Sequence, residues 1–305
     1  MTRVPFCFVD VFARRPLTGN PLSLVPDADD LTEPQMQAIA REFNQSETTF
    51  VLHPTVRPTG HPAGPDATWR LRSFTPIGAE VFGAGHNALG AWLWLAAAGR
   101  IAVGAGQRLT QEIGDQVLPV EVRRGDDGNV SVTMDQSEAT FGEIVLDRTE
   151  LAAALSLGPA DLVPGEAAQV VDTGAGHLLV PVRDRAAVDR AVPVTGRLAA
   201  VLRQAGGEGC YLYSRDPADD TDVVAYTRFF NPTMGIAEDP ATGTAAGPLV
   251  ARLVAEGKVA GDGRPVIVEQ GHKLGRPSRI QVSVAGPRVR VGGSGLVVAE
   301  GTIAL

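Results

Sequence analysis

The chain has 305 residues, of which 44% are hydrophobic and 20% are charged, and its formal net charge at pH 7 is -8. This length and apolar content allow a full hydrophobic core and suggest about two domains. The negative charge, without any basic cluster, argues against nucleic acid or an anionic membrane as a partner. The N-terminus lacks a signal-peptide pattern, and no apolar run approaches the roughly 18 residues of a membrane span. We therefore expect a cytoplasmic protein.

The first part of the chain predicts strands and one helix. Phe6 to Val11 and Leu22 to Val25 have strand patterns separated by a turn. Thr32 opens a T-x-x-Q capping box, and apolar residues then recur at helical spacing as far as Phe43. Polar residues next lead into a strand of β-branched and aromatic residues, with Glu47 at its entry. A carboxylate there would be partly shielded from water.

Two turns of small residues each open an apolar helix. The first is Gly85 to Gly90 and the second is Glu238 to Gly247, and an R-x-F-x-P motif precedes each of them. His86 and Thr244 lie at the same distance from the glycine that ends each helix, so they hold equivalent places at the two N-termini. Unpaired N–H groups at such positions bind anions. One unit of strand, turn and buried helix is therefore predicted to occur twice.

Alternating strand patterns follow each of the two helices. In the first half they cover Gln116 to Arg123 and Val130 to Met134, and Glu143 to Leu157 is then expected to be a connecting and helical region. A similar series of strands closes the second half. The pattern predicts an α+β fold with two halves, 1–135 and 136–305, each a mixed and mostly antiparallel sheet wrapped round a central helix.

Cofactor and metal sites are disfavoured by the surroundings of the candidate residues. Gly83 to Ala88 matches the dinucleotide motif G-x-G-x-x-A, but the next strand-like run, Ile101 to Val103, ends without the acidic residue that holds a ribose. His86 has no second ligand at metal-binding spacing. Cys7 and Cys210 each lie in an apolar run, which favours buried thiols. We expect no metal and no cofactor.

Four separated stretches, in the same order, resemble the PhzF family of phenazine biosynthesis. They are Asp27 to Leu52, Arg72 to Gly90, Glu238 to Gly247 and Glu269 to Ser278, followed by a similar C-terminal Gly301 to Leu305. The resemblance implies the diaminopimelate epimerase fold, in which two pseudo-symmetric halves enclose the site. It also implies a homodimer.

The resemblance further implies a cofactor-independent isomerase. Its substrate would be a small conjugated carboxylic acid of secondary metabolism, with a dihydro-hydroxyanthranilate or a related diene acid expected first. The family's acid-base glutamate falls on Glu47, and its other catalytic residues fall on His86 and Asp239. Related epimerases use a pair of cysteines at the two helix ends, and neither cysteine of this chain is near those positions.

The residues expected to bind the substrate lie beside the catalytic ones. They are Ser46, Gly85, Asn87, Gly243 and Thr244. Two of them depart from the family pattern, because Asn87 stands where the family often has proline and Thr244 stands where it has serine.

Simpler structural roles and two other functions remain open from the sequence. Glu47 could be a surface carboxylate, and Asp239 and Thr244 could cap the second helix. The scaffold could also serve a small-molecule binding protein without activity, or a nicotinamide-dependent oxidoreductase that uses the first glycine turn.

Overall fold

The structure, a computed structural model, describes residues 2–55, 68–104, 109–125, 128–216 and 222–305. The chain divides into two compact units, Met1–Met134 with Gly292–Leu305 (unit 1) and Asp135–Val291 (unit 2). The division expected from the sequence assigned residues 292–305 to the second half. They belong to unit 1 because the C-terminal strand pairs with the N-terminal strand, from Val11 with Gly295 to Arg3 with Ala304.

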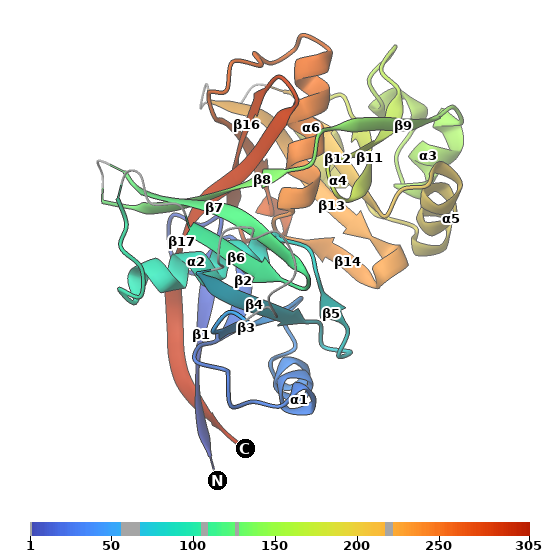
Figure 1. Cartoon of the computed structure of the whole chain (residues 1–305). Coiled ribbons are helices and arrows are strands. Elements are labelled where there is room, and N and C mark those ends of the chain that lie inside the picture. The colour runs from blue at the N-terminus through green and yellow to red at the C-terminus, as the bar shows by residue number, and fades with distance from the viewer. Residues whose placement is uncertain (1, 56–67, 105–108, 126–127, 217–221) are drawn as a thin grey trace. The chain divides into compact units, whose positions relative to one another are not determined.

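Unit 1 contains two helices and the strands around them (Figure 1). Its elements are β1 (Arg3–Val11), β2 (Asn20–Val25), α1 (Glu33–Phe43), β3 (Thr48–Leu52), β4 (Trp69–Phe74), β5 (Glu80–Val81), α2 (His86–Ala97), β6 (Leu109–Ile113), β7 (Gln116–Arg124) and most of β8 (Val130–Gln136, whose last two residues belong to unit 2), with part of β17 (Arg288–Ala304). In the described ranges no helix is long and apolar enough to cross a membrane.

The first helix, α1, begins where its capping box predicts. The Thr32 N–H donates to Gln35 Oε1 at 2.9 Å, and Asn44 ends the helix in the left-handed conformation with φ 51°. Met36 and Ile39 on its buried face belong to one hydrophobic cluster with residues of β3 and β4. This packing fixes the loop that follows α1 and leads to Glu47.

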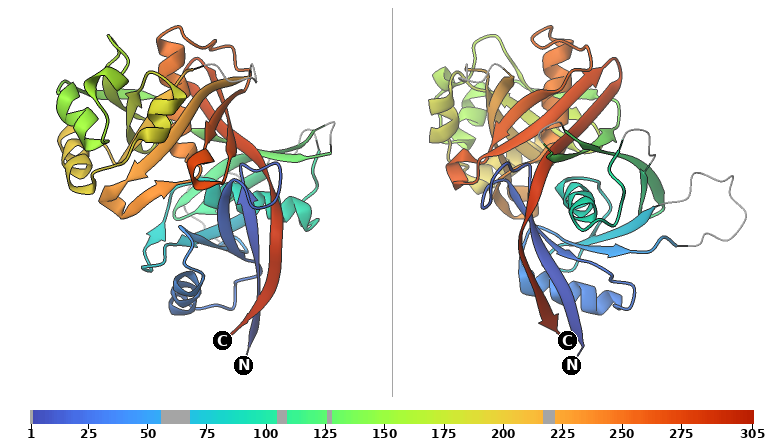
Figure 2. Two further views of the ribbon diagram at one scale, coloured as in Figure 1. Left: turned by 180° about the vertical axis from the view of Figure 1, so that it is seen from behind. Right: turned by 90° about the vertical axis from the view of Figure 1, so that its left-hand side faces the viewer.

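The second helix, α2, is apolar on nearly every side because strands surround it. It contacts β1, β2, β3 and β4, and the right-hand view of Figure 2 shows it inside the curve of the sheet of unit 1. Trp92 is fully buried, and its Nε1–H donates to Gln111 Oε1 at 2.8 Å. A Cβ atom on Gly90 would lie 2.5 Å from Leu22 Cδ2 and 2.9 Å from Val11 Cγ2. The glycine therefore lets the helix approach the sheet closely.

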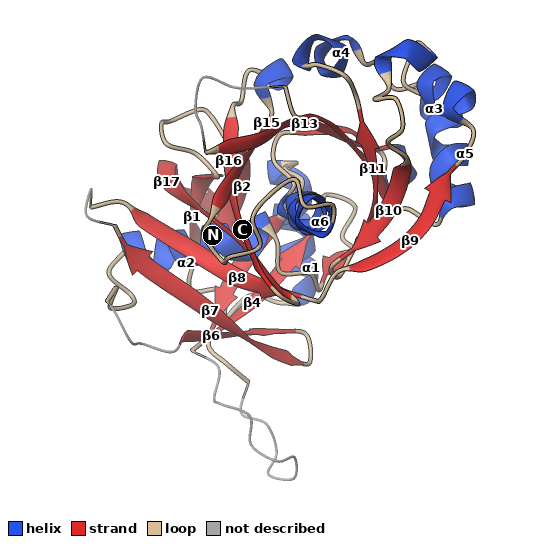
Figure 3. Ribbon diagram, turned by 90° about the horizontal axis from the view of Figure 1, so that it is seen from above, coloured by secondary structure: helices blue, strands red, loops and turns tan. Residues whose placement is uncertain are grey.

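Unit 2 repeats this arrangement around α6. Its elements are β9 (Thr140–Val145), α3 (Arg148–Ala154), η1 (Pro159–Asp161), β10 (Ala168–Asp172), β11 (Gly176–Pro181), α4 (Arg185–Arg190), α5 (Thr195–Ala205), β12 (Gly209–Ser214), β13 (Val223–Asn231), η2 (Pro232–Met234), β14 (Ile236–Asp239), α6 (Gly243–Ala255), β15 (Val266–Gln270), η3 (His272–Leu274) and β16 (Ser278–Ala285). Figure 3 shows α6 end-on within a ring of strands that includes β11, β13, β15 and β16.

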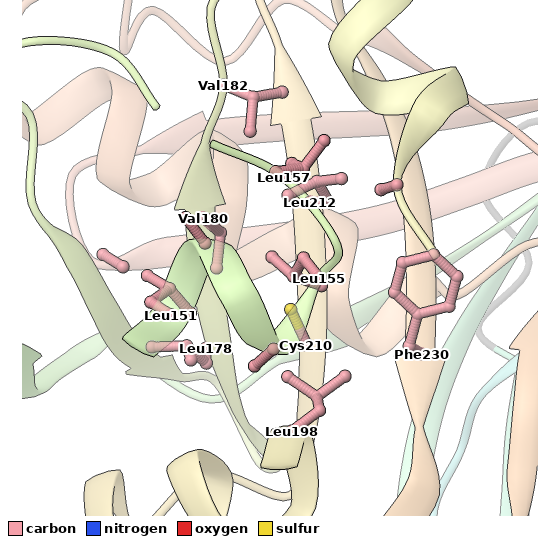
Figure 4. Close-up of a cluster of buried hydrophobic side chains, with 14 of the residues drawn as sticks. Leu151, Leu155, Leu157, Leu178, Val180, Val182, Leu198, Cys210, Leu212 and Phe230 are labelled. Atoms are coloured by element: carbon pink, nitrogen blue, oxygen red, sulfur yellow. The ribbon is translucent and has the colours of Figure 1, made fainter. Parts of the chain in front are cut away.

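The outer core of unit 2 lies between its sheet and α3, α4 and α5. Figure 4 shows Leu151 and Leu198, from α3 and α5, facing Cys210 of β12 and Phe230 of β13. Neither α4 nor α5 was predicted from the sequence, and the connecting region expected from Glu143 onward includes the last residues of β9. The spacing of buried residues in α5 is helical, so this element could have been found from the sequence.

The order of strand pairing is the same in the two units. In unit 1 the pairs β1–β2, β2–β3, β3–β4, β4–β6 and β6–β7 are antiparallel, parallel, antiparallel, parallel and antiparallel. In unit 2 the pairs β10–β11, β11–β12, β12–β13, β13–β15 and β15–β16 follow the same series. The predicted fold, two halves that each wrap a mixed sheet round a helix, is confirmed.

The R-x-F motif has the same structural role in both units. Arg72 makes two bonds of 2.7 Å to the Glu80 carboxylate, and its guanidinium carbon lies 4.9 Å from the ring centroid of Phe74. Arg228 bonds both oxygens of Glu238, at 2.9 and 2.7 Å, and lies 4.8 Å from the ring of Phe230. Each pair ties the strand before a small-residue turn to its neighbour. The motif thus holds the start of each central helix in place.

Candidate active site

The Gly85 to Gly90 motif forms the first turns of α2, which begins at His86. Gly85 caps the helix with φ -120° and ψ -142°. Asn87 Oδ1 accepts from the Gly85 N–H at 2.8 Å, and Asn87 Nδ2 donates to Gly83 O at 3.0 Å and to Ser73 Oγ at 3.1 Å. The side chain of Asn87 thus closes the glycine turn from inside and sets the position of His86.

Glu47 and Ser46 both contact the imidazole of His86. Glu47 Oε2 lies 3.1 Å from His86 Nε2, and Ser46 Oγ lies 3.3 Å from the same nitrogen. The side chains of His86 and Glu47 are 12% and 20% exposed, so the pair is largely shielded from water. Three residues that the sequence analysis selected therefore meet within unit 1.

Glu47 is positioned by the buried start of β3. Ser23 Oγ, on β2, lies 3.3 Å from Glu47 O and 2.6 Å from Thr48 Oγ1. Thr49 Oγ1 lies 2.9 Å from Ser73 Oγ, which in turn accepts from Asn87. The buried hydroxyls of Thr49 and Ser73 thus connect the strand that presents Glu47 to the turn that presents His86.

The carboxylate of Glu47 has an atom well suited to accept a proton. Its Oε2 is fully enclosed, and among the described residues it accepts no hydrogen bond, since the His86 N–H is close but not aligned with it. A buried acceptor without a donor is uncommon and costs free energy. A substrate hydrogen placed against this atom would meet a base that need not first give up a hydrogen bond.

In unit 2, Asp239 ends β14 and is held by Thr242 and Gln270. Thr242 Oγ1 donates to Asp239 Oδ2 at 2.5 Å. Gln270 is fully buried, and its Nε2 donates to Asp239 O at 2.7 Å and to Thr242 Oγ1 at 3.0 Å. Its Oε1 accepts from the Thr242 N–H at 3.1 Å and from Tyr211 OH at 2.9 Å. The network fixes both the backbone and the carboxylate of Asp239.

The first two residues of α6 also contact polar groups. Gln136 Nε2 donates to Gly243 O at 3.2 Å, and Gln136 Oε1 accepts from Thr173 Oγ1 at 2.9 Å. Thr244 Oγ1 lies 3.3 Å from Nε2 of His177, a residue of β11. Within unit 2 the structure therefore places Asp239, Gly243 and Thr244 at the start of one helix.

Comparison with known proteins identifies the family. The family model described as phenazine biosynthesis-like protein (PhzC-PhzF) matches residues 9–301. The chain belongs to the PhzC-PhzF family. It is 34% identical to the trans-2,3-dihydro-3-hydroxyanthranilate isomerase of Pseudomonas chlororaphis, over 98% of this chain and 99% of that protein. The resemblance predicted from the four sequence stretches is confirmed.

Two solved structures show how far the likeness extends. The crystal structure of a PhzF family phenazine biosynthesis protein from Bacillus anthracis has a TM-score of 0.88 and 28% identity, with all of both chains covered. A hydroxyproline epimerase from Agrobacterium vitis has a TM-score of 0.62 and 13% identity, over 99% of this chain and 93% of that one. This second likeness concerns the fold alone.

The repeat has no second glutamate at the place of Glu47. Thr48 pairs with Phe74 on β4, and Cys210 pairs with Phe230 on β13, so the residue before Cys210 is the counterpart of Glu47. That residue is Gly209, where a Cβ would overlap the ring of Phe229. The repeat of this PhzC-PhzF chain therefore has two equivalent positions, of which one holds a carboxylate, Glu47, and the other holds Gly209.

The two thiols of this family member lie at buried strand positions. Cys7 on β1 and Cys210 on β12 are both buried, as predicted, and burial raises the pKa of each thiol to about 12. A thiol protonated at neutral pH is a poor base and nucleophile. Across the described residues, no group of three or more His, Cys, Asp or Glu side chains gathers in a metal-binding arrangement.

The glycine turn does not have the setting of a dinucleotide-binding motif. It follows β5, a strand of two residues that pairs antiparallel with β4, and it belongs to a mixed sheet that wraps a helix. In a Rossmann fold the same motif follows a strand of an open, mostly parallel sheet. This setting gives the nicotinamide alternative no structural support, since the turn opens the central helix of unit 1.

Several residues that organise the candidate site were not selected from the sequence. Gln270 and Thr242 lie inside two of the stretches that carried the family resemblance, so these motifs contained the signal. For Gln136 and His177 the sequence contained no such signal, because each contacts α6 from a strand that is distant in the sequence. Asn87 was expected to bind substrate, but its oxygen and both its amide hydrogens already bond protein groups. We therefore assign Asn87 to the turn.

Proposed function

We propose that this protein is a cofactor-independent isomerase that moves a proton between two carbons of a small conjugated carboxylic acid. The enclosed and unbonded Oε2 of Glu47, 3.1 Å from His86, is the observation that carries the proposal. The name of the Pseudomonas chlororaphis relative supports trans-2,3-dihydro-3-hydroxyanthranilate as the first substrate to test, with related diene acids next.

In the proposed reaction a single carboxylate moves the proton. Glu47 takes a proton from one carbon, the electron pair shifts along the conjugated double bonds, and Glu47 returns the proton to another carbon of the same system. The reaction needs neither an oxidant nor a reductant, because substrate and product are isomers. A positioned acid-base group of this kind contributes typically about 10² to 10⁴ in rate. The glycine at the counterpart position supports one base in place of two.

The other candidate residues hold and orient the substrate. His86 and Ser46 limit the positions open to the Glu47 carboxylate, and Asp239 would pair with an amino group such as that of the dihydro-hydroxyanthranilate. Gly85, Gly243 and Thr244 lie at helix N-termini, where N–H groups and a hydroxyl stabilise negative charge. A substrate carboxylate fits this chemistry.

Substitution of Glu47 tests the proposal. Glu47→Gln keeps the size and hydrogen-bonding capacity of the side chain but removes its basicity, so turnover should fall by at least about 10³-fold with affinity nearly unchanged. The matched control is Glu208→Gln, since Glu208 precedes β12 as Glu47 precedes β3 and its pKa is raised by burial and by Asp172. The control should keep full activity. Retained turnover in Glu47→Gln would refute the mechanism.

Isotope incorporation gives a second measurement on the same reaction. In deuterated water the product should carry deuterium at its new C–H position, and less than one full equivalent where enclosed Glu47 returns the original proton. Turnover of any tested diene acid also separates an isomerase from a binding protein without activity. A protein that binds these acids tightly and never converts them would favour the second alternative.

A further inference from the structure

His177 is a buried histidine on β11, beside the N-terminus of α6. It is 3% exposed, and its ring packs edge-on against Phe229 with the centroids 5.1 Å apart. Gly209 leaves space for this arrangement, because a Cβ there would overlap the Phe229 ring and lie 3.3 Å from His177 Nδ1. The imidazole is therefore held in one orientation, with Nε2 3.3 Å from Thr244 Oγ1.

Burial also determines the charge of this ring. Removal from water lowers the pKa of His177 to about 4, and the nearby Asp172 opposes this only in part. At neutral pH the imidazole is therefore uncharged. A neutral imidazole carries one hydrogen, so one ring nitrogen is a donor and the other is an acceptor.

The surroundings of the two nitrogens decide which of them carries the hydrogen. Nδ1 is fully enclosed and has no hydrogen-bond partner in the described part of the chain. A hydrogen there would be a buried donor without an acceptor, which folded proteins hardly ever contain, whereas an unused lone pair is tolerated more often. On Nε2 the hydrogen is donated to Thr244 Oγ1. The Nε2–H form is therefore favoured.

This tautomer sets the direction of the Thr244 hydroxyl. The hydroxyl has a single hydrogen, and its oxygen is already accepting from His177. Among the described residues, Thr244 has no other side-chain hydrogen-bond partner. The Thr244 O–H is thus available to donate a hydrogen bond to an acceptor other than His177.

We propose that His177 is a positioning residue that makes the Thr244 hydroxyl a hydrogen-bond donor to an oxygen of the substrate. The role rests on the proposed function, in which Thr244 binds the substrate. With the opposite tautomer, the Thr244 hydrogen would be directed into the protein, toward His177, and the substrate would meet a lone pair. A carboxylate or hydroxyl oxygen of the substrate would then lose one attractive contact.

The tautomer can be measured without any substrate. Nitrogen NMR of the imidazoles at pH 7 should show an uncharged ring with its hydrogen on Nε2 whose signal is missing in His177→Gln. A hydrogen on Nδ1, or a charged ring at pH 7, would overturn the proposal. This result stands whether or not the protein proves to be an isomerase.

A double-mutant cycle tests the effect on binding. Affinity for trans-2,3-dihydro-3-hydroxyanthranilate is measured in the Glu47→Gln background, where the acid is bound without being converted. His177→Leu and Thr244→Val should each weaken binding by roughly 10-fold, the cost of one hydrogen bond, and the double variant should bind no more weakly than either single one. His177→Gln, whose amide can donate to Thr244, should recover most of the affinity.

The possible outcomes are distinct. Additive losses, unchanged affinity in His177→Leu, or no recovery in His177→Gln would each contradict the positioning role. If His177→Leu does not fold, the tautomer and the affinity of His177→Gln decide the question. If the parent protein neither binds nor converts this acid or any related diene acid, the proposed function has failed, and the tautomer measurement still reports on His177 separately.

Discussion

Asn87 shows how a residue beside the candidate base can act through the backbone. It is 5% exposed, and its amide bonds the Gly85 N–H, Gly83 O and Ser73 Oγ. A proline at this position, as the family often has, would fix φ without these bonds. In this chain the hydrogen bonds of Asn87 fix the backbone of the turn instead. The replacement of proline by asparagine therefore affects how His86 is held more than how the substrate is contacted.

Asn87→Ala should therefore lower both stability and turnover. Loss of the amide removes the partners of the partly buried Gly85 N–H and the exposed Gly83 O, and it takes one partner from the buried Ser73 hydroxyl, which together should cost about 1 to 3 kcal/mol of unfolding free energy. Turnover should fall because His86 no longer has a fixed position beside Glu47. Urea unfolding and steady-state kinetics measure the two effects, with Ser73→Ala, which removes one partner of Asn87 and one of Thr49, as the milder control. Unchanged stability with weakened binding would instead place Asn87 against the substrate.

At the scale of single elements, the sequence predicted whether a segment is a helix or a strand better than it predicted the residues at which the element begins and ends. The two turns were expected to lie before their helices, but Gly90 and Gly247 are both inside them. Their place depends on what packs against them: Leu22 and Val11 lie against Gly90, and Gln136 against Gly247. Contacts of this kind come from distant strands, so local patterns could not show why a helix interior needs glycine.

Two glycine substitutions separate the effect of packing on stability from the effect of helix propensity. Gly90→Ala should destabilise the protein by roughly 1 to 2 kcal/mol, because the gain in propensity of about 1 kcal/mol is outweighed by the overlap with Leu22 and Val11. Gly196→Ala in α5 is the matched control, since a Cβ there meets nothing within 4 Å. It should stabilise by up to about 1 kcal/mol. Thermal unfolding measures both, and equal shifts would contradict the packing explanation.

At the scale of the whole molecule, the repeat made the fold predictable. The two R-x-F-x-P motifs and the equal spacing from His86 to Gly99 and from Thr244 to Gly257 indicated one unit used twice, and the two series of strand pairs match. The position of residues 292–305 was missed because antiparallel pairing of β17 with β1 joins the two ends of the chain. Pairing between such distant segments leaves no signal in the local pattern of either one.

The candidate site was predictable where it lies close to a motif. Glu47, Ser46 and His86, which were selected from motifs, lie in contact, and Asp239 and Thr244 stand at the start of α6. The residues that orient them, Gln270 and His177, act across the sheet of unit 2. Their roles depend on burial and on hydrogen bonds to residues far away in the sequence. These contacts exist only in the folded sheet, so the sequence pattern does not reveal them.

The homodimer implied by the family resemblance remains to be measured. Sedimentation at micromolar concentration should give a mass near twice that of one chain, 31.9 kDa. The mass should not change on moderate dilution if the dimer is stable. A monomer over this range would remove the dimer from the proposal without affecting the chemistry of Glu47.

The stability of the whole protein should depend on pH through His177. Its pKa is lowered by burial to about 4 in the folded protein, against about 6.5 in an unfolded chain. Between these values the unfolded chain binds the extra proton, so the free energy of unfolding is highest above about pH 6.5 and falls as the pH drops toward 4, by roughly 3 kcal/mol in all. The pKa of His272 is also lowered by burial, but it titrates in wild type and variant alike. Urea unfolding of wild type and His177→Gln from pH 7.5 to 4.5 should therefore show a difference that changes steadily with pH, whereas parallel curves would mean that His177 is not held neutral.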